Sequence, residues 1–307
     1  MEKKYIFIVN PTAGRGAGKL ALPEIDRLSK SLNLEYEIIC TEYPKHAIDL
    51  AQQAAAGSAS YVISVGGDGT SNEVLNGLMR AYNQDFRDFT MGIIGVGRGN
   101  DFAFGFNIPA GIQAGFEIIQ RNQARLVDVG FIKGGDYPQG RYFGNGVGIG
   151  FDAVVGFEAA KLTHLHGFIN YVVAALKTIF LYFHAPTLRI EYDNQALDQP
   201  ALMVSIMNGR RMGGGFMMAP EAHTDDGLLD LCIAGQVSRF GILKLIPKFM
   251  NGTQASHPQV KTGNATNIHV LAMDGVLPTH ADGETICVAG KELMIELIQQ
   301  PIKILCG

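Results

Sequence analysis

The segment at 66–70 reads GGDGT and has the composition of a phosphate-binding loop. A short apolar run precedes it and helix-compatible sequence follows it. Its three glycines let the backbone come close to a bulky anion, and the N–H groups at the start of a following helix favour phosphate. A bare phosphate would repel Asp68, so this carboxylate predicts a divalent cation or a water network beside the phosphates. A strand–turn–helix junction that simply needs glycine is the alternative.

Two further glycine-rich turns follow predicted strands, NPTAGRGAG at 10–18 and GVGRGND at 95–101. The first could contribute Asn10 and backbone donors, or it could only cap the next helix. The second carries Arg98, which can pair with phosphate, and Asp101, which fits a helix N-cap as well as a ligand. Recurrence at three strand ends favours phosphate binding. The pattern GxxxxGK[ST] is absent from the sequence, which excludes a P-loop enzyme.

Two acidic clusters lie in the second half of the chain. Asp225 and Asp226 occupy a turn between apparent strands, which is either a hairpin turn or a site for a hard cation with Asp226 as a ligand. Asp282 and Glu284 would point to the same face if the backbone is extended. A carboxylate there could accept the proton of a hydroxyl substrate during phosphoryl transfer. From local sequence alone, a β-turn is the favoured reading of this second cluster.

These residues need a scaffold, and the first third of the chain alternates strand-like and helix-like segments. We expect strands at 5–9, 35–40, 61–65 and 91–94, with helices ending near 33, spanning 47–56, and ending near 82. Thr70 or Ser71 is the expected cap of the last helix. This alternation predicts a parallel sheet with helices on both faces. Ligands bind such sheets at the carboxyl ends of the strands, where the three glycine-rich turns fall.

From about residue 125 the pattern changes to consecutive strands separated by turn signals. We expect strands at 126–132, 141–147, 187–192, 201–207, 228–234, 267–272 and 285–289, with one helical stretch from 151 to about 184. Strands that follow one another without helices predict antiparallel pairing and a β-sandwich. The predicted domains are 1–125 and 126–291. Segment 292–305 forms either two strands of the second domain or one strand that returns to the first.

Composition excludes several classes of protein. The chain has 307 residues, of which 47% are hydrophobic, and 25 basic against 29 acidic side chains give a formal charge of −4. This balance provides no basic field for nucleic acid. The four cysteines are far apart, which favours buried thiols in a reducing compartment over a disulfide framework.

The chain shows no candidate for a membrane-spanning segment. The first apolar run is too short for a signal peptide, and we expect a cytoplasmic protein. Asn170 and Lys177 interrupt the most apolar helix candidate, at 166–186, and leave apolar segments too short to span a bilayer. That helix is either a core helix or an amphipathic surface that contacts lipid, so membrane contact would be peripheral. The sequence does not decide the oligomeric state, and a homodimer is one alternative.

Taken together, the motifs resemble the diacylglycerol kinase catalytic family, specifically the soluble bacterial lipid kinases that are similar to sphingosine kinases. They cover nearly the whole chain in the expected order: NPTAG, GGDGTSNEVLNG, GRGNDFAFGFNIP, DVG at 128–130, NGVGIGFDA at 145–153, PEAHTDDGLLDL at 220–231 and MDGVLPTHADGE at 273–284. GGDGT alone also occurs in NAD kinases and phosphofructokinases. The extended motif with GNDFA downstream is more specific.

The resemblance implies an NAD-kinase-like three-layer α/β domain and a β-sandwich domain, with the active site in the cleft between them. It implies MgATP as the phosphoryl donor and a lipid hydroxyl as the acceptor. Together with the loop residues above, the expected nucleotide contacts are Asn10, Thr41, Gly66, Gly67, Asp68, Gly69, Thr70, Asn72, Glu73, Arg98 and Asn100.

The resemblance also assigns the acidic residues. Asp282 matches the general base of the family, with Glu284 beside it. Asp226 matches the carboxylate ligand of a structural Mg²⁺, with the backbone carbonyls of His223 and Leu228 completing the site. We expect Asp68 to hold the catalytic Mg²⁺ directly or through water.

One departure from the family pattern concerns the third loop, where Arg98 stands in place of the usual threonine. Arginine could replace the hydroxyl contact with a charged one, or it could block the usual nucleotide pose. Our leading hypothesis is a lipid kinase that acts on diacylglycerol or a related lipid. The alternatives are an NAD kinase-like phosphotransferase, for which a second nucleotide motif is missing, and a non-catalytic nucleotide- or lipid-binding regulator, which Arg98 favours.

Overall fold

The computed structural model describes residues 3–57, 59–85, 89–97, 99–162, 167–182 and 184–307. By the density of its internal contacts, the chain divides into two compact units. Unit 1 is formed by Met1–Val127 together with Gln300–Gly307, and unit 2 by Asp128–Gln299. Within the described parts of the chain, we find no helix both long and apolar enough to cross a membrane.

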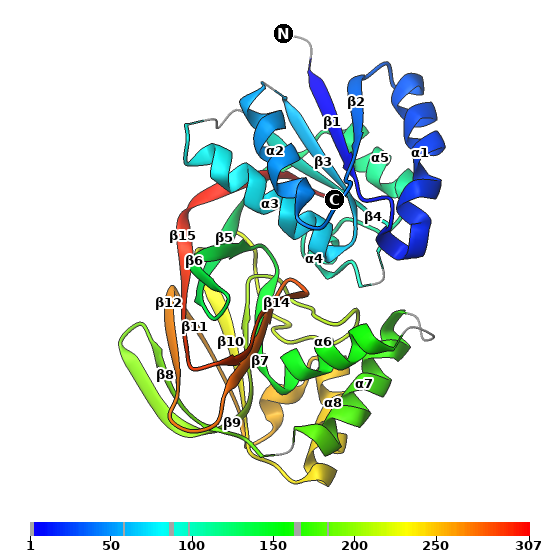
Figure 1. Ribbon diagram of the computed structural model, residues 1–307. Helices are drawn as coiled ribbons and strands as arrows, with labels where there is room; N and C mark the ends of the chain where they lie inside the picture. The colour runs from blue at the N-terminus through cyan, green and yellow to red at the C-terminus, as the bar shows by residue number, and fades with distance from the viewer. Residues whose placement is uncertain (1–2, 58, 86–88, 98, 163–166, 183) are drawn as a thin grey trace. The chain divides into compact units, whose positions relative to one another are not determined.

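Unit 1 is a three-layer α/β fold. Its elements are β1 (Lys4–Val9), α1 (Ala13–Ser31), β2 (Glu35–Cys40), α2 (His46–Ala56), β3 (Tyr61–Gly66), α3 (Asp68–Tyr82), β4 (Thr90–Gly95), α4 (Asp101–Gly105) and α5 (Ile112–Arg121). The strands are parallel in the order β2-β1-β3-β4. In Figure 1, α1 and α5 lie on one side of this sheet and α2 and α3 on the other. The predicted βαβαβαβ pattern is confirmed.

The central strands of unit 1 are buried on both faces. Every residue of β3 is buried, as are five of the six residues of β1 and of β4, whereas the edge strand β2 is only partly buried. Strands covered by helices on both sides read as continuous apolar runs rather than as alternating patterns. This is why YIFIV and YVISV were recognisable as strands.

Unit 2 is an antiparallel β-sandwich, and its described residues also form three α-helices. Its elements are β5 (Ala124–Gly134), β6 (Tyr137–Phe143), β7 (Gly146–Gly150), α6 (Phe151–Lys161), α7 (Gly167–Leu181), β8 (Thr187–Tyr192), β9 (Gln195–Met207), β10 (Leu229–Gly235), α8 (Arg239–Asn251), a 3₁₀ turn (Gln254–Ser256), β11 (Val260–Ala265), β12 (Asn267–Ala272), β13 (Leu277–Ala281), β14 (Glu284–Gly290) and β15 (Glu292–Leu305). One layer contains β5, β6, β8, β12 and β15, and the other contains β7, β10, β11, β13 and β14. The long strand β9 pairs with β8 in its first half and with β7 and β10 in its second.

The second layer of the sandwich is buried on both faces. Along β9, Val204 and Ile206 join the core between the two layers, whereas Met203 and Met207 join a second core formed with the helices. The same alternation holds along β10 and its neighbours. Because successive side chains of a strand point to opposite faces, this layer separates the sandwich core from a helix-covered core that contains α6, α7 and α8.

Several expectations about unit 2 were wrong in detail. The stretch expected as one strand at 141–147 is the end of β6 and the start of β7, and the helical stretch from 151 to 184 is two helices. Strands β11 and β13 and helix α8 were not predicted. In α8 an internal proline and exposed apolar side chains blur the amphipathic pattern that marks a helix.

Two boundary predictions can also be settled. Helix α3 begins at Asp68 after Gly67, so Thr70 and Ser71 lie inside the helix and do not cap it. The final segment is a single strand, β15, which pairs with β12 in unit 2 and, through Ile304, with Met91 of β4 in unit 1.

The contact between α2 and α3 depends on a glycine. A Cβ placed on Gly77 would lie 2.2 Å from the carbonyl oxygen of Ile48 and 2.7 Å from the Cβ of Ala51. An alanine at an ordinary helical position gains about 1 kcal/mol over glycine. Overpacking a tight contact costs roughly 1–3 kcal/mol or more, so the clash should outweigh the gain.

We therefore predict that Gly77→Ala destabilises the protein by about 1 kcal/mol or more. Gly156 in α6 is the matched control, because its added Cβ would meet only a ring carbon of His280 at 3.9 Å. Gly156→Ala should stabilise by about 0.5–1 kcal/mol. Thermal unfolding followed by circular dichroism measures both, and a Gly77→Ala protein as stable as the parent would contradict the packing argument.

Candidate active site

Unit 1 brings its three glycine-rich turns together at the carboxyl ends of β1, β3 and β4. The backbone N–H of Asn10 donates to Val65 O at 2.9 Å, and that of Val96 donates to Gly66 O at 2.8 Å. Each turn is therefore tied to the central strand β3. The predicted gathering of these turns at one sheet edge is confirmed.

Side chains join the first two turns. Asn10 Nδ2 donates to Thr70 Oγ1 at 3.1 Å, and Asn10 Oδ1 accepts from the hydroxyl of Thr12 at 2.8 Å. Thr70 is buried, and a Cβ on Gly66 would lie 2.3 Å from its Oγ1. Glycine at 66 thus leaves the space that the Thr70 side chain occupies. Packing alone therefore requires a glycine here, whether or not the backbone also contacts phosphate.

The second and third turns approach each other backbone to backbone. A Cβ on Gly97 would lie 2.5 Å from the Cα of Gly67. Asn100 has φ +52 and accepts from the N–H of Gly97 at 3.1 Å, which shapes the third turn. Asp68 Oδ1 accepts from the N–H of Phe102 at 2.8 Å. The Asp68 carboxylate therefore links the start of α3 to the start of α4.

The remaining expected nucleotide contacts have structural partners. Thr41 follows β2 and donates its N–H to Val9 O at 2.8 Å. Asn72 is fully buried inside α3 and accepts from the Asn76 amide. Glu73 accepts from the N–H of Lys45 at 3.1 Å.

The nucleotide-binding roles of these residues stay predictions. Gly69 lies in the first turn of α3. The prediction for Arg98 concerns a residue outside the described part of the chain.

In unit 2, Asp282 occupies the turn between β13 and β14. It has φ +48 and is buried. Its Oδ1 accepts from the N–H groups of Asn145 and Gly146 at 3.0 and 2.9 Å, and its Oδ2 accepts from that of Gly144 at 2.8 Å. Backbone donors that converge on one carboxylate fix both its position and the plane of its oxygens.

This geometry changes the expected relation between Asp282 and Glu284. The left-handed backbone at Asp282 means that segment 282–284 is not extended, so the rule that alternate residues share a face does not apply. Glu284 is partly exposed, and its Oε2 lies 4.0 Å from Nη2 of the buried Arg141. Its nearest described charged partner is therefore an arginine rather than a second carboxylate.

The acidic turn after β9 concentrates negative charge. The N–H of Gly227 donates to Asp128 Oδ2 at 2.8 Å, and Asp226 Oδ1 accepts from the N–H of Leu228 at 3.0 Å. Burial, reinforced by repulsion from Asp226, raises the pKa of Asp230 to about 6. Burial also raises the pKa of Asp128, with the Gly227 hydrogen bond opposing it and the neighbouring carboxylates adding to it. A cation would relieve this repulsion.

The expected cation site at this turn uses one carboxylate and two carbonyls. His223 and Asp226 are exposed and Leu228 is partly exposed, so their oxygens lie near the surface. Across the residues that the structure describes, no group of three or more His, Cys, Asp and Glu side chains is arranged to hold a metal ion. Asp226 with backbone carbonyls remains a predicted ligand set.

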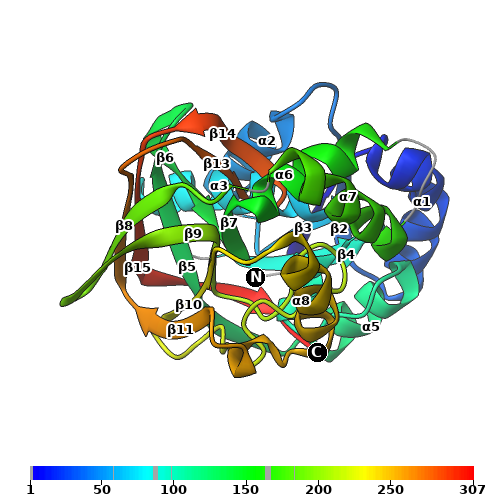
Figure 2. The ribbon, with the colours of Figure 1, turned by 90° about the horizontal axis from the view of Figure 1, so that it is seen from below.

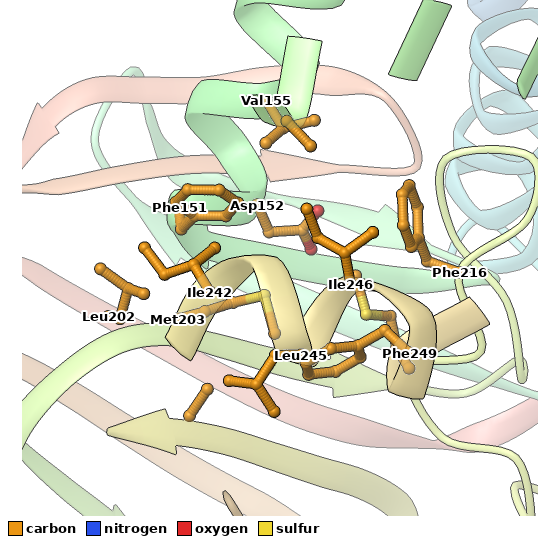
Figure 3. Close-up of a pocket in the computed structure, with 13 residues that line it drawn as sticks. Phe151, Asp152, Val155, Leu202, Met203, Phe216, Ile242, Leu245, Ile246 and Phe249 are labelled. Carbon is orange, nitrogen blue, oxygen red and sulfur yellow. The ribbon is translucent and has the colours of Figure 1, made fainter. Parts of the chain in front are cut away.

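A pocket that was not predicted lies between the second strand layer and α6, α7 and α8 (Figure 3). Its cavity has a volume of about 60 Å³ and opens to solvent on one side. Its walls are almost entirely apolar and consist of Phe151, Val155, Ala175, Leu202, Met203, Phe216, Met218, Ala234, Ile242, Leu245, Ile246 and Phe249.

One charged side chain lines this pocket. Asp152 is buried, and Figure 3 shows its carboxylate among apolar side chains. Its Oδ2 lies 3.5 Å from Ser205 Oγ and 3.9 Å from Nε2 of the buried His280. A Cβ on Gly148 would lie within 2.5 Å of both Asp152 and His280. Glycine at 148 therefore makes the room in which the carboxylate and the imidazole meet.

Sequence reasoning did not single out Asp152. The signal was available, because a single acidic residue stands among apolar residues and glycines in GVGIGFDAVVG. Its surroundings come from β9, β13 and α8, which no local pattern connects. The charge of Asp152 adds to burial in raising the pKa of the Cys232 thiol to about 12, so this neighbouring cysteine stays protonated.

Comparisons with known protein families cover both units. The model described as the diacylglycerol kinase catalytic domain matches residues 4–132. The model described as the YegS C-terminal NAD kinase beta sandwich-like domain matches residues 145–305, more than half of the chain.

Individual relatives match almost the full length. A Staphylococcus saprophyticus protein named diacylglycerol kinase is 27% identical over 285 residues, which cover 92% of this chain and 90% of the relative. A Mycobacterium tuberculosis protein of the same name is 28% identical over 292 residues, which cover 94% and 91%. A crystal structure of a diacylglycerol kinase from Bacillus anthracis str. Sterne has the same fold, with a TM-score of 0.73, 22% identity and coverage of 100% and 97%. The chain belongs to the diacylglycerol kinase family whose catalytic domain is followed by a YegS-type C-terminal β-sandwich domain.

Proposed function

We propose that this protein is an ATP-dependent lipid kinase that transfers the γ-phosphoryl group to the hydroxyl of diacylglycerol or a related lipid. The observation that carries the proposal is the pocket of unit 2, whose apolar walls suit an acyl chain and include one buried carboxylate, Asp152. Family membership and the names of the relatives support the same reaction class.

ATP is the proposed donor, bound at the glycine-rich turns of unit 1. Backbone N–H groups at the start of α3 favour phosphate. Gly67 and Gly97 lie close together, and neither carries a side chain that could stand between its turn and a phosphate. Asn10 and Thr70, already hydrogen-bonded to each other, would present polar atoms beside the nucleotide.

Mg²⁺ is the proposed cofactor, and the residues present fit it. At the acidic turn, burial is the main cause of the raised pKa values of Asp128 and Asp230, and the negative charge of Asp226 adds to both. Asp226 and the carbonyls of His223 and Leu228 are hard oxygen ligands of the kind Mg²⁺ prefers. Asp68 would hold a second Mg²⁺, whose charge would offset the charge of the phosphates.

Asp282 is the proposed general base. As the lipid hydroxyl oxygen forms a bond to the γ-phosphorus, the hydroxyl proton passes to the Asp282 carboxylate. The bond from the γ-phosphorus to the bridging oxygen breaks, and ADP leaves. The backbone donors at 144–146 hold the carboxylate in one orientation, which lowers the entropic cost of meeting the hydroxyl.

The apolar pocket favours a lipid acceptor over a dinucleotide. An NAD kinase-like reaction would require polar partners for a ribose and two phosphates. The described pocket offers an aspartate within walls of aliphatic, aromatic and methionine side chains.

We predict that Asp282→Asn lowers turnover at least about 100-fold, the usual contribution of a general base, while ATP binding is kept. Asp68→Asn retains an oxygen for the Phe102 N–H but removes a charge, so it should weaken Mg-ATP binding about tenfold or more. Radiolabelled ATP with dispersed diacylglycerol measures turnover, and a fluorescent ATP analogue measures binding. Thermal unfolding checks that both variants are folded. Full turnover by Asp282→Asn would refute the base, and no lipid product from the parent enzyme would refute the function.

For the acidic turn we predict that Mg²⁺ at about 100 times its Kd adds about 2.7 kcal/mol of stability, which should raise Tm by about 4 °C for a chain of this length. Asp226→Asn should lose most of this shift. Asp225→Asn, which changes the neighbouring exposed carboxylate outside the proposed ligand set, should keep it. Differential scanning calorimetry with and without Mg²⁺ provides the test, and an equal shift in the Asp226→Asn protein would contradict the site.

For the pocket we predict opposite effects of two substitutions on acceptor length. Ala234→Leu fills space and should favour short-chain diacylglycerols, whereas Phe216→Ala creates space and should favour long-chain ones. A change of about three to tenfold in the ratio of kcat/KM values is expected, because a methylene in an apolar pocket is worth about 1 kcal/mol. General destabilisation cannot move the two ratios in opposite directions. Identical chain-length profiles would exclude this pocket as the acyl site.

A further inference from the structure

Helix α7 carries an exposed apolar stripe. Ile169, Val173, Leu176 and Phe180 are 64%, 37%, 41% and 74% exposed. Their spacing of four, three and four residues places them on one side of the helix. The opposite side of α7 is buried and includes Ala174, Ala175 and Ile179. The helix therefore has apolar side chains on its buried side and on its exposed side.

Helix α8 repeats this arrangement. Phe240, Leu243 and Met250 are 77%, 42% and 40% exposed, and Pro247 is exposed at the position between the last two. This spacing of three, four and three residues again follows one side of a helix. Its opposite side, with Ile242, Leu245 and Phe249, lines the pocket.

The two stripes belong to neighbouring helices. Helices α7 and α8 are in contact and lie side by side in both views of the ribbon (Figures 1 and 2). The guanidinium of Arg239 in α8 lies 5.8 Å from the ring centre of Phe180 in α7. We call the eight exposed residues of both stripes the α7–α8 face. Exposed apolar stripes on neighbouring helices are typical of a protein or membrane interaction site.

Charge narrows the choice of partner. The sequences of α7 and α8 contain Lys177, Arg239, Lys244 and Lys248 and no acidic residue. Lys177 also pairs with Glu158 of α6. Apolar stripes flanked by Lys and Arg without acids are typical of helices that lie on anionic lipid surfaces. A second copy of the same face would bring cations against cations, which disfavours a symmetric dimer here.

We propose that the α7–α8 face docks on the surface of an anionic lipid bilayer. The eight apolar side chains would enter the boundary between headgroups and acyl chains, and the cationic side chains would contact lipid phosphates. The inference deepens the proposed function, because the pocket behind these helices would then take its acceptor from the same membrane. Docking itself requires no catalysis, so the two can fail separately.

The test is sedimentation of the full-length protein with phosphatidylcholine vesicles, with and without phosphatidylglycerol. The double variant Phe180→Ser/Phe240→Ser should lower the partition coefficient at least tenfold on anionic vesicles. Lys244→Glu should lower it severalfold at low salt and less at high salt, because salt screens exposed charges. The matched control is Leu20→Ser/Val288→Ser, which changes two side chains 82% and 65% exposed outside the face and should bind like the parent.

Two outcomes would overturn the docking face: unchanged vesicle binding by the Phe180→Ser/Phe240→Ser protein, or an equal loss in the control. A dimer in sedimentation velocity that the double variant dissociates would assign the face to a second copy instead. Activity on a detergent-dispersed short-chain diacylglycerol separates the two proposals. The double variant should keep it, whereas its absence in the parent protein would count against the kinase and leave the vesicle result standing.

Discussion

The organisation of unit 2 depends on the buried carboxylate of Asp282 and the backbone N–H groups that converge on it. These donors come from residues 144–146, more than 130 positions earlier in the chain. A buried carboxylate without such partners would be strongly unfavourable, and buried N–H groups would each need another acceptor. The interaction therefore fixes the break between β6 and β7 and the turn between β13 and β14 at once. It also explains why the single strand expected at 141–147 is two strands.

The hydrogen bonds between Asp282 and residues 144–146 set the position of the pocket as well. Strand β13 ends just before Asp282 and carries His280 opposite Gly148 of β7. Gly148 leaves room for the Asp152–His280 contact, and Asp152 opens α6 directly after β7. The proposed base, Asp282, follows β13, and the only charged side chain described in the pocket wall, Asp152, follows β7. These two strands are paired with each other. A change in the hydrogen bonds between Asp282 and residues 144–146 would move both side chains. The position of the proposed base and the shape of the proposed acceptor site are therefore coupled.

Local sequence was sufficient for the four strands and the first three helices of unit 1, but not for α4 and α5. It was insufficient for the site in unit 2. Strands buried on both faces and glycine turns at their ends leave a signal within a few residues, as at 61–70. The cap of α3 was misplaced because Gly67, which has no side chain to signal a cap, precedes the helix. The orientation of Asp282, the pocket and the role of Gly148 depend on residues far apart in the chain. Helix α8 was missed because its exposed side is as apolar as its buried side.

That last feature has a physical consequence for α7 and α8. A helix with large apolar side chains on opposite sides is normally enclosed by protein or lipid, yet both helices are enclosed on one side only in the described part of the chain. Their buried sides differ in kind: small alanines on α7 leave space, whereas large side chains on α8 form the pocket wall. The same two helices therefore limit the pocket from within and present large apolar side chains outward. On a lipid bilayer, the exposed apolar side chains of such helices would be removed from water like the buried ones. A lipid is also the ligand that could pass from the bilayer to the pocket without leaving apolar surroundings.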